Sequence, residues 1–145
     1  MPRTTQCAFI IPGRAFSANS KSAAAYKAKI AKIARQHINE PLTQNELHVK
    51  VDYFHKSKNK VDGDNLLKNV LDGLKRVAYL DDAQVTHTEA CLHNINSSFT
   101  IEEPASPEIF DWLAKEKEQE FVAVLVRVRP RFILKVFTRR TKDGK

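Results

Sequence analysis

The chain has 145 residues and a formal net charge of +7, with 42% hydrophobic and 28% charged residues. A chain of this length can bury about two-thirds of its unfolded surface in one domain, and the composition argues against a disordered protein. Cys7 and Cys91 are far apart and match no metal-binding spacing, so neither a disulfide framework nor a zinc site is expected.

The first half of the chain predicts a strand, a helix and a second strand. Residues 5–11 are apolar and end at a proline–glycine turn, and the helix formers of residues 23–37 follow a run of helix-capping side chains. Residues 46–55 alternate in polarity, which predicts a strand whose buried face begins at Leu47 and continues at every second residue. The other face of this strand would carry His48, Lys50, Asp52 and Phe54.

The second half predicts two helices and three strands. The helices cover about residues 62–77 and 107–118, and the strands cover about residues 84–92, 121–128 and 132–137. A basic loop precedes the first of these helices, and a serine, a proline and an early acid mark the start of the second. The order β-α-β-α-β-(α)-β-β indicates one α/β (α+β) domain over residues 1–145, with a mixed sheet packed with two main helices.

The sequence shows no segment typical of membrane targeting or membrane spanning. The apolar run at residues 8–11 is too short for the core of a signal peptide. No run approaches the length of a membrane span, which needs about 18 apolar residues. We therefore expect a cytoplasmic protein without a membrane partner.

Charge is distributed unevenly along the chain. Residues 1–50 contain eight basic and two acidic side chains, residues 51–120 contain eight and fourteen, and residues 121–145 contain eight and one. Basic outer segments around an acidic centre suit a protein that attracts a polyanion and holds divalent cations against it. The charge pattern therefore favours nucleic-acid binding, although a merely basic, soluble surface would give the same totals.

The helix that follows the basic loop has one apolar and one charged face. At 100° per residue, Asp64, Lys68 and Asp72 fall on the side opposite the leucines, with Asp64 and Lys68 one turn apart. Asp62 comes just before the helix, where an extended backbone would point its side chain to the same side as Asp64. Gly63 between them allows a tight turn or the close approach of a ligand.

Two further acids, Asp81 and Asp82, follow the far end of this helix. If the strands before and after the helix pair in one sheet, one of these acids can approach Asp62 and Asp64. Clustered carboxylates suit Mg²⁺ or Mn²⁺, and such an ion activates water and polarises a phosphoryl oxygen. Lys68 would then stabilise the charge that develops on the phosphorus centre. The pattern predicts metal-assisted phosphodiester hydrolysis.

Each of these features also has a purely structural explanation. Asp64 can cap the helix and Asp62 can close an Asx turn. Asp64 and Lys68 can form an ordinary surface pair, which stabilises a helix by only about 0.3–0.5 kcal/mol. Two adjacent acids in a short loop are common. Residue types and spacing alone leave both explanations open.

These residues also carry a family resemblance. Residues 60–68 contain Asp-x-Asp-Asn-Leu-x-Lys, residues 72–74 contain Asp-x-Leu, and residues 80–85 contain Asp-Asp-x-Gln-Val. This pattern, including the spacing between its halves, resembles the signature of the RusA-type Holliday junction resolvases. The resemblance covers residues 47 to about 92.

The resemblance implies a small homodimeric endonuclease that needs Mg²⁺, for which Mn²⁺ substitutes, and that uses no nucleotide cofactor. Family members cut four-way DNA junctions symmetrically in recombination and repair, and many are carried by phages or prophages. Matched residue by residue, the metal-binding and catalytic carboxylates are Asp62, Asp64 and Asp82, and the essential lysine is Lys68. The expected DNA contacts are Arg14, Lys56, Lys58 and Lys60.

Some features lie outside this resemblance. Residues 93–145 include a C-terminal extension that diverges from the family. Three histidines, His55, His87 and His93, are interpreted as ordinary strand or loop residues. A flap nuclease or another nuclease of branched DNA would use the same acids, and a non-catalytic DNA-binding protein would carry them for structural reasons. The sequence does not separate these alternatives from a junction resolvase.

Overall fold

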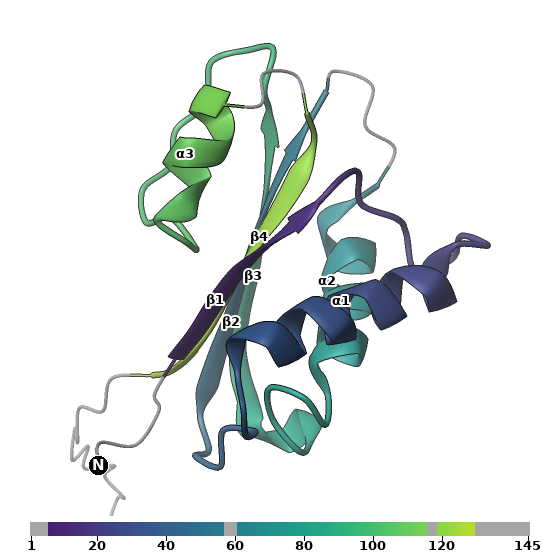
Figure 1. Ribbon diagram of the computed structural model, residues 1–145, viewed down its shortest axis with the longest axis vertical. Helices are drawn as coiled ribbons and strands as arrows, with labels where there is room; N and C mark the ends of the chain where they lie inside the picture. Colours follow the sequence, from purple (N-terminus) through teal and green to yellow (C-terminus); the bar gives the residue numbers. More distant parts are fainter. Residues whose placement is uncertain (1–5, 57–60, 116–118, 130–145) are drawn as a thin grey trace, which may run out of the picture.

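A four-stranded mixed sheet with helices on both faces organises the chain in the computed structural model, which describes residues 6–56, 61–115 and 119–129 (Figure 1). The strands are β1 (Gln6–Pro12), β2 (Leu47–His55), β3 (Val85–Asn94) and β4 (Phe121–Val128). The helices are α1 (Ala23–His37), α2 (Gly63–Leu74) and α3 (Glu108–Lys115), and a short 3-10 helix, η1, covers Asp82–Gln84. The predicted mixed α/β fold is confirmed. The strand predicted over 132–137 lies outside the described residues.

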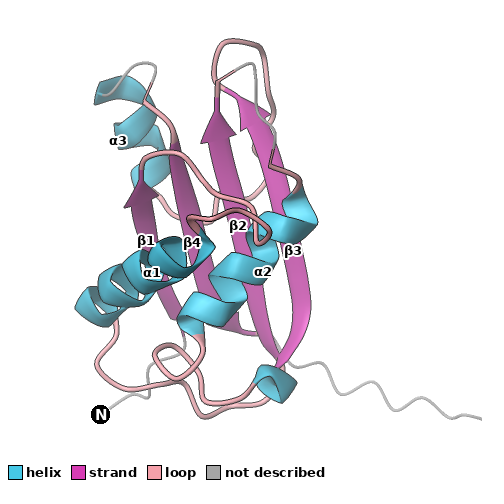
Figure 2. Cartoon of the chain, turned by 90° about the vertical axis from the view of Figure 1, so that its right-hand side faces the viewer, coloured by secondary structure: helices cyan, strands magenta, loops and turns pink. Residues whose placement is uncertain are grey.

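The sheet has the strand order β1-β4-β2-β3. β2 and β3 pair in parallel, so they lie in one sheet, but Val85 at the start of β3 lies opposite Leu47 at the start of β2, at the far end of β2 from Asp62; the β1–β4 and β2–β4 pairs are antiparallel. α1 and α2 cover one face of the sheet, and α3 lies on the other (Figures 1 and 2). No helix within the described residues has both the length and the apolar character needed to cross a bilayer.

The core is divided by the sheet into two clusters. The larger lies under α1 and α2 and includes Tyr26, Ile30 and Leu66, together with Val49 and Val51 of β2. The smaller lies under α3 and is formed by Ile10, Phe54, Ala105, Ile109, Phe121, Ala123 and Leu125. α2 ends at Leu74, before the predicted residue 77, because the next two residues leave helical geometry, the second with a positive φ of 72°.

Gly73 permits the close contact between α1 and α2. A Cβ atom at this position would lie 2.9 Å from Ile30 Cβ and 2.9 Å from the backbone oxygen of Lys27. We expect Gly73→Ala to lower the free energy of unfolding by about 1–3 kcal/mol through overpacking. At an ordinary position inside a helix, replacing glycine by alanine instead raises the free energy of unfolding by about 1 kcal/mol. Urea denaturation measures the difference.

Gly63→Ala is the matched control for this variant. Its added Cβ would lie 3.5 Å from Ala90 Cβ, an ordinary van der Waals distance. We expect its stability to equal or exceed that of the unmodified protein. Equal stabilities for the Gly73 and Gly63 variants would contradict the tight α1–α2 contact.

Candidate active site

A pocket of about 280 Å³ lies between α2 and the edge strand β3. Its lining includes three carboxylates and one ammonium group among mainly apolar side chains: Asp64, Leu67, Lys68, Leu71, Asp72, Tyr79, Asp82, Val85 and Thr88. α2 runs alongside β3, and η1 lies at the start of that strand (Figure 2). The pocket therefore joins the two halves of the sequence motif, which come from separate segments of the chain.

Asp62 serves as the N-cap of α2. Its Oδ1 accepts a hydrogen bond of 2.9 Å from the backbone N–H of Asn65, and its Oδ2 accepts one of 3.1 Å from the Asn65 side-chain amide. Side-chain acceptors at this position satisfy backbone donors that the first helical turn leaves free. The cap is thus Asp62 and not Asp64, and Asp62 does not line the pocket.

Asp64 and Lys68 project from α2 one turn apart, as the periodicity predicts, and both line the pocket. Both side chains are exposed. Within the described parts of the chain, neither side chain takes part in a hydrogen bond or an ion pair, so the surface pair considered above does not form. An exposed carboxylate and an ammonium group without protein partners are available to a ligand.

Asp82 reaches the same pocket from the loop before β3. Its Oδ2 lies 3.4 Å from Lys75 Nζ, an ion pair that is partly exposed to solvent. Tyr79 beside it is fully buried and donates a hydrogen bond of 2.8 Å to the backbone oxygen of Leu71. Burial, followed by the charges of Asp82 and Asp72, raises the pKa of Tyr79. The phenol therefore stays protonated at neutral pH.

Gln84 holds the loop that carries Asp82. Its Oε1 accepts hydrogen bonds from the backbone N–H groups of Leu80 and Asp81, at 2.8 and 3.0 Å. Its Nε2 donates to the backbone oxygens of Leu42 and Gln44, at 2.8 and 2.9 Å. The side chain is 7% exposed, so the loop position depends on these four bonds.

We expect Gln84→Leu to lower the free energy of unfolding by about 2 kcal/mol, because it leaves buried backbone groups without partners. Gln36→Leu applies the same change to an exposed residue of α1 and should alter stability by less than about 0.5 kcal/mol. Chemical denaturation of both variants gives the comparison. Equal losses would show that Gln84 does not clamp the loop.

The three predicted metal ligands do not form a compact cluster in this structure. Gly63 lies against β3 at one end of α2, and Asp82 pairs with Lys75 at the other. The 12 residues of α2 span about 18 Å. Within the described residues, the one group of His, Cys, Asp or Glu whose ligand atoms all approach within 4.8 Å lies elsewhere. The convergence of Asp62, Asp64 and Asp82 on one ion therefore stays a prediction.

Two of the basic residues predicted to contact DNA lie at one end of the sheet. The backbone N–H of Lys56 and the hydroxyl of Tyr53 both donate to the carboxylate of Glu120, at 2.9 and 2.7 Å. Burial and the bond to Glu120 raise the pKa of Tyr53, and the nearby charge of Arg14 opposes that shift. Arg14 and Lys56 thus both lie in the region of Tyr53. Outside the described residues lie Lys58 and Lys60.

Comparison with known proteins identifies the family to which the chain belongs. The family model of endodeoxyribonuclease RusA matches residues 13–102, which is more than half of the chain. The chain belongs to the RusA endodeoxyribonuclease family. The comparison with curated proteins gives no match. The RusA match extends beyond residues 47–92 in both directions, so α1 and all of β3 fall within it.

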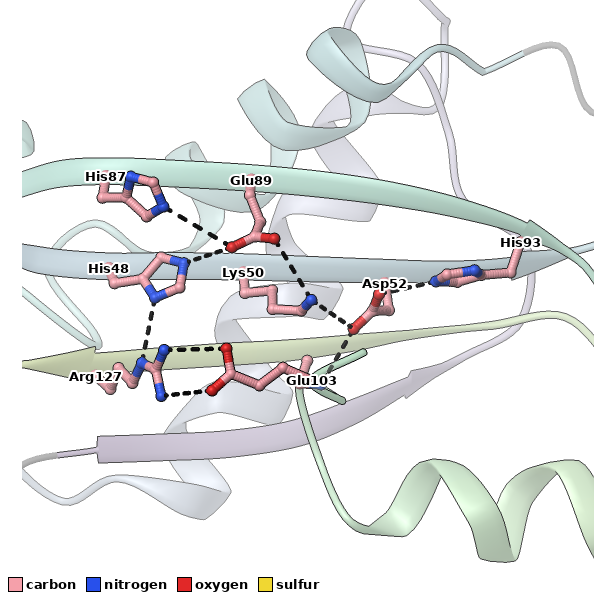
Figure 3. Close-up of polar contacts among 9 residues, drawn as sticks. His48, Lys50, Asp52, His87, Glu89, His93, Glu103 and Arg127 are labelled. Atoms are coloured by element: carbon pink, nitrogen blue, oxygen red, sulfur yellow. Dashed lines mark hydrogen bonds and ion pairs between the residues drawn. The ribbon is translucent and has the colours of Figure 1, made fainter. Parts of the chain in front are cut away.

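This RusA family member also has a layer of polar side chains on the face of its sheet opposite α1 and α2, which we call the polar layer (Figure 3). It comprises His48, Lys50, Asp52, His87, Glu89, His93, Glu103 and Arg127. Its three β2 members, His48, Lys50 and Asp52, are only 5%, 5% and 1% exposed. The prediction of a half-buried strand was therefore wrong. β2 is an inner strand, and side chains of its neighbours surround and pair with its polar residues.

The histidines of the polar layer were not identified as a group by sequence reasoning. His87 and His93 lie in β3, as expected of strand residues, and His55 ends β2. Burial lowers the pKa of His48, and the hydrogen bond to Glu89 only partly offsets this effect. The spacing of His87, Glu89 and His93 by even numbers of residues was the available signal, because it places all three on one face of a strand.

Proposed function

We propose that the protein is a Mg²⁺-dependent endonuclease that resolves four-way DNA junctions by paired symmetrical nicks. The observation that carries this proposal is the pocket shared by Asp64, Lys68 and Asp82 in a chain of the RusA family. The two acids come from separate segments, as the family motif requires, and the lysine projects beside the first of them. A purely structural set of acids does not explain why Lys68, which makes no hydrogen bond or ion pair within the described residues, shares their pocket.

The carboxylates of the pocket are of the ligand type that a hard divalent cation prefers. Asp64 and Asp82 offer carboxylate oxygens, and Mg²⁺ binds through a few carboxylates while keeping several waters. Asp62 would join them if its carboxylate turned away from Asn65. When bound, the ion would supply an activated water and polarise the phosphoryl oxygen, and Mn²⁺ would serve in its place.

The protein's own side chains have distinct tasks in this proposal. Asp64 and Asp82 would hold the cation, for which the Asp82 carboxylate must leave Lys75 and move towards the first turn of α2. Lys68 directs a compact positive charge at the phosphate, where negative charge builds up in the transition state. The apolar wall formed by Leu67 and Leu71 excludes part of the bulk water and strengthens these interactions.

DNA binding would rest on the four basic residues that the family resemblance assigns to it. Arg14 and Lys56 lie at the end of the sheet, and Lys58 and Lys60 continue the basic segment into α2. Contacts with phosphates position a protein on DNA and make its affinity fall steeply with salt. A homodimer would present two equivalent pockets to the two strands of a junction that are related by twofold symmetry.

The test is cleavage of a mobile synthetic four-way junction in Mg²⁺, compared with a flap substrate and a linear duplex of the same sequences. Paired nicks at symmetrical positions of the junction, with little cutting of the other two, support the proposal. Preferred cutting of the flap would identify a different branched-DNA nuclease. Binding of the junction without cleavage in Mg²⁺ or Mn²⁺ would identify a non-catalytic DNA-binding protein.

A further inference from the structure

Three side chains of the polar layer bring metal-ligand atoms together at the outer edge of the sheet. His48 Nε2 lies 3.0 Å from Glu89 Oε1, and His87 Nε2 lies 3.9 Å from the same oxygen. All three ligand atoms approach within 4.8 Å of one another, and the two imidazole rings are 4.5 Å apart (Figure 3). The ligands come from the adjacent strands β2 and β3 and point away from α2.

We propose that His48, His87 and Glu89 form a binding site for a transition-metal ion of the Zn²⁺ type, separate from the acidic pocket. Zinc binds imidazole nitrogen and carboxylate oxygen at about 2.0–2.2 Å, so tetrahedral ligand atoms stand about 3.3 Å apart. The observed separations of 3.0 and 3.9 Å lie on either side of that value. Three protein ligands leave the fourth position for water.

The ligand types distinguish this ion from the one proposed for the acidic pocket. Imidazole nitrogen suits Zn²⁺, Co²⁺, Ni²⁺ or Cu²⁺, whereas Mg²⁺ prefers oxygen ligands. Ala90 faces Gly63 of α2, and its neighbour Glu89 points to the opposite face of the sheet. The two sites thus use different faces and different elements, and either can exist without the other.

Neighbouring side chains already hold the Glu89 carboxylate in place. Glu89 Oε2 lies 3.5 Å from Lys50 Nζ, which itself lies 3.9 Å from Asp52 Oδ2. Oε1 therefore faces the two histidines, while Oε2 keeps its partner. Hydrogen-bonded partners of this kind orient the ligands of protein metal sites. His48 is buried and His87 is exposed, so the ion would be reached from the outer edge of β3.

Arg127 opposes metal binding. Its Nε donates a hydrogen bond of 3.2 Å to His48 Nδ1, and because arginine is always a donor, the proton of neutral His48 lies on Nε2. A metal at Nε2 requires that proton to move to Nδ1 and Arg127 to turn aside. The guanidinium also reaches Glu103 at 3.3 and 3.4 Å, which gives Arg127 a second partner when it leaves His48.

This competition predicts opposite effects for two substitutions. His87→Gln removes an exposed ligand and should weaken Zn²⁺ or Co²⁺ binding at least tenfold without disturbing the core. Arg127→Gln should strengthen binding severalfold, because its amide oxygen can accept the Nδ1 proton. His37→Gln removes an exposed histidine of α1 and is the matched control, with unchanged affinity expected.

The experiment is titration of the purified full-length protein with Co²⁺ followed by visible absorption, and equilibrium dialysis with Zn²⁺ followed by metal analysis. We expect one ion per chain and tetrahedral Co²⁺ absorption. Arg127→Gln should bind the ion most tightly, the unmodified protein and His37→Gln equally, and His87→Gln most weakly. Asp64→Asn should bind Zn²⁺ unchanged, which separates this site from the acidic pocket. The proposal is overturned by any of three results: no stoichiometric binding, equal affinities of His87→Gln and the unmodified protein, or a thiolate charge-transfer band that assigns the ion to Cys91.

Discussion

Asp64→Asn should abolish DNA cleavage in Mg²⁺ and leave binding to a four-way junction at moderate salt intact or slightly tighter. The substitution keeps the size of a side chain that lines the pocket and removes the charge that would hold the cation. Loss of metal activation removes several kcal/mol of transition-state stabilisation, so we expect a rate decrease of about a thousandfold or more. The affinity for the junction does not fall, because the substitution removes a negative charge near the DNA phosphates.

Single-turnover cleavage and gel-shift binding of the same junction measure these two effects. Asp111→Asn is the control, since it makes the same chemical change at an exposed residue of α3, on the other side of the sheet. It should cut at the unmodified rate. Cleavage by Asp64→Asn at a similar rate would show that the assignment of the metal site is wrong, even if the protein is a nuclease.

Local pattern predicted most of the fold because most elements have a local cause. The helix over 23–37 and the strand over 121–128 were predicted with the observed bounds, since helix formers and β-branched residues end sharply there. The burial of both faces of β2 could not be predicted in this way. It depends on β4 and β3 lying on either side of β2, and β4 is contributed by residues far along the chain.

Local pattern likewise predicted only part of the candidate site. The positions of Asp64 and Lys68 on one face of α2 follow from helical period, and the pocket confirms that they lie together. The position of Asp82 depends on how β2 and β3 pair, and the sequence could state only as a condition that the two strands lie in one sheet; their parallel register places Asp82 near the start of β2, not near its end, which leads to Asp62. The meeting of His48 with His87 depends on the register of that pairing, including a shift at its start, and no local pattern determines a register.

Asp52 is the most constrained charge in the polar layer. It is 1% exposed, and its Oδ1 lies 2.9 Å from His93 Nε2. Its Oδ2 accepts a hydrogen bond of 3.1 Å from the backbone N–H of Ala105 and lies 3.9 Å from Lys50 Nζ. Asp52 thereby joins β2 to β3 and to the segment that leads into α3. Removal of this carboxylate would leave the buried N–H of Ala105 without its acceptor, and the buried ammonium group of Lys50 would keep Glu89 but lose Asp52.

We expect Asp52→Leu to lower the free energy of unfolding by about 3–5 kcal/mol, because it leaves the buried N–H of Ala105 and the Nε2 of His93 without their partner and removes one of the two carboxylates beside the buried Lys50. Asp52→Asn should lower it by less, since its amide oxygen can still accept from the N–H of Ala105 and its amide nitrogen lies within reach of His93 Nε2. Urea denaturation followed by circular dichroism gives both values.

Asp72→Leu makes the same change where the carboxylate pairs with Lys27 at 3.1 Å and both side chains are more than a third exposed. An exposed pair of this kind contributes at most about 1 kcal/mol. The free energy of unfolding of this control should therefore lie within about 1 kcal/mol of that of the unmodified protein. Buried ion pairs in some proteins can be replaced by apolar residues without loss, provided that both partners are replaced. An Asp52→Leu protein as stable as the control would mean that Lys50 finds sufficient compensation in Glu89, and that the polar layer does not depend on Asp52.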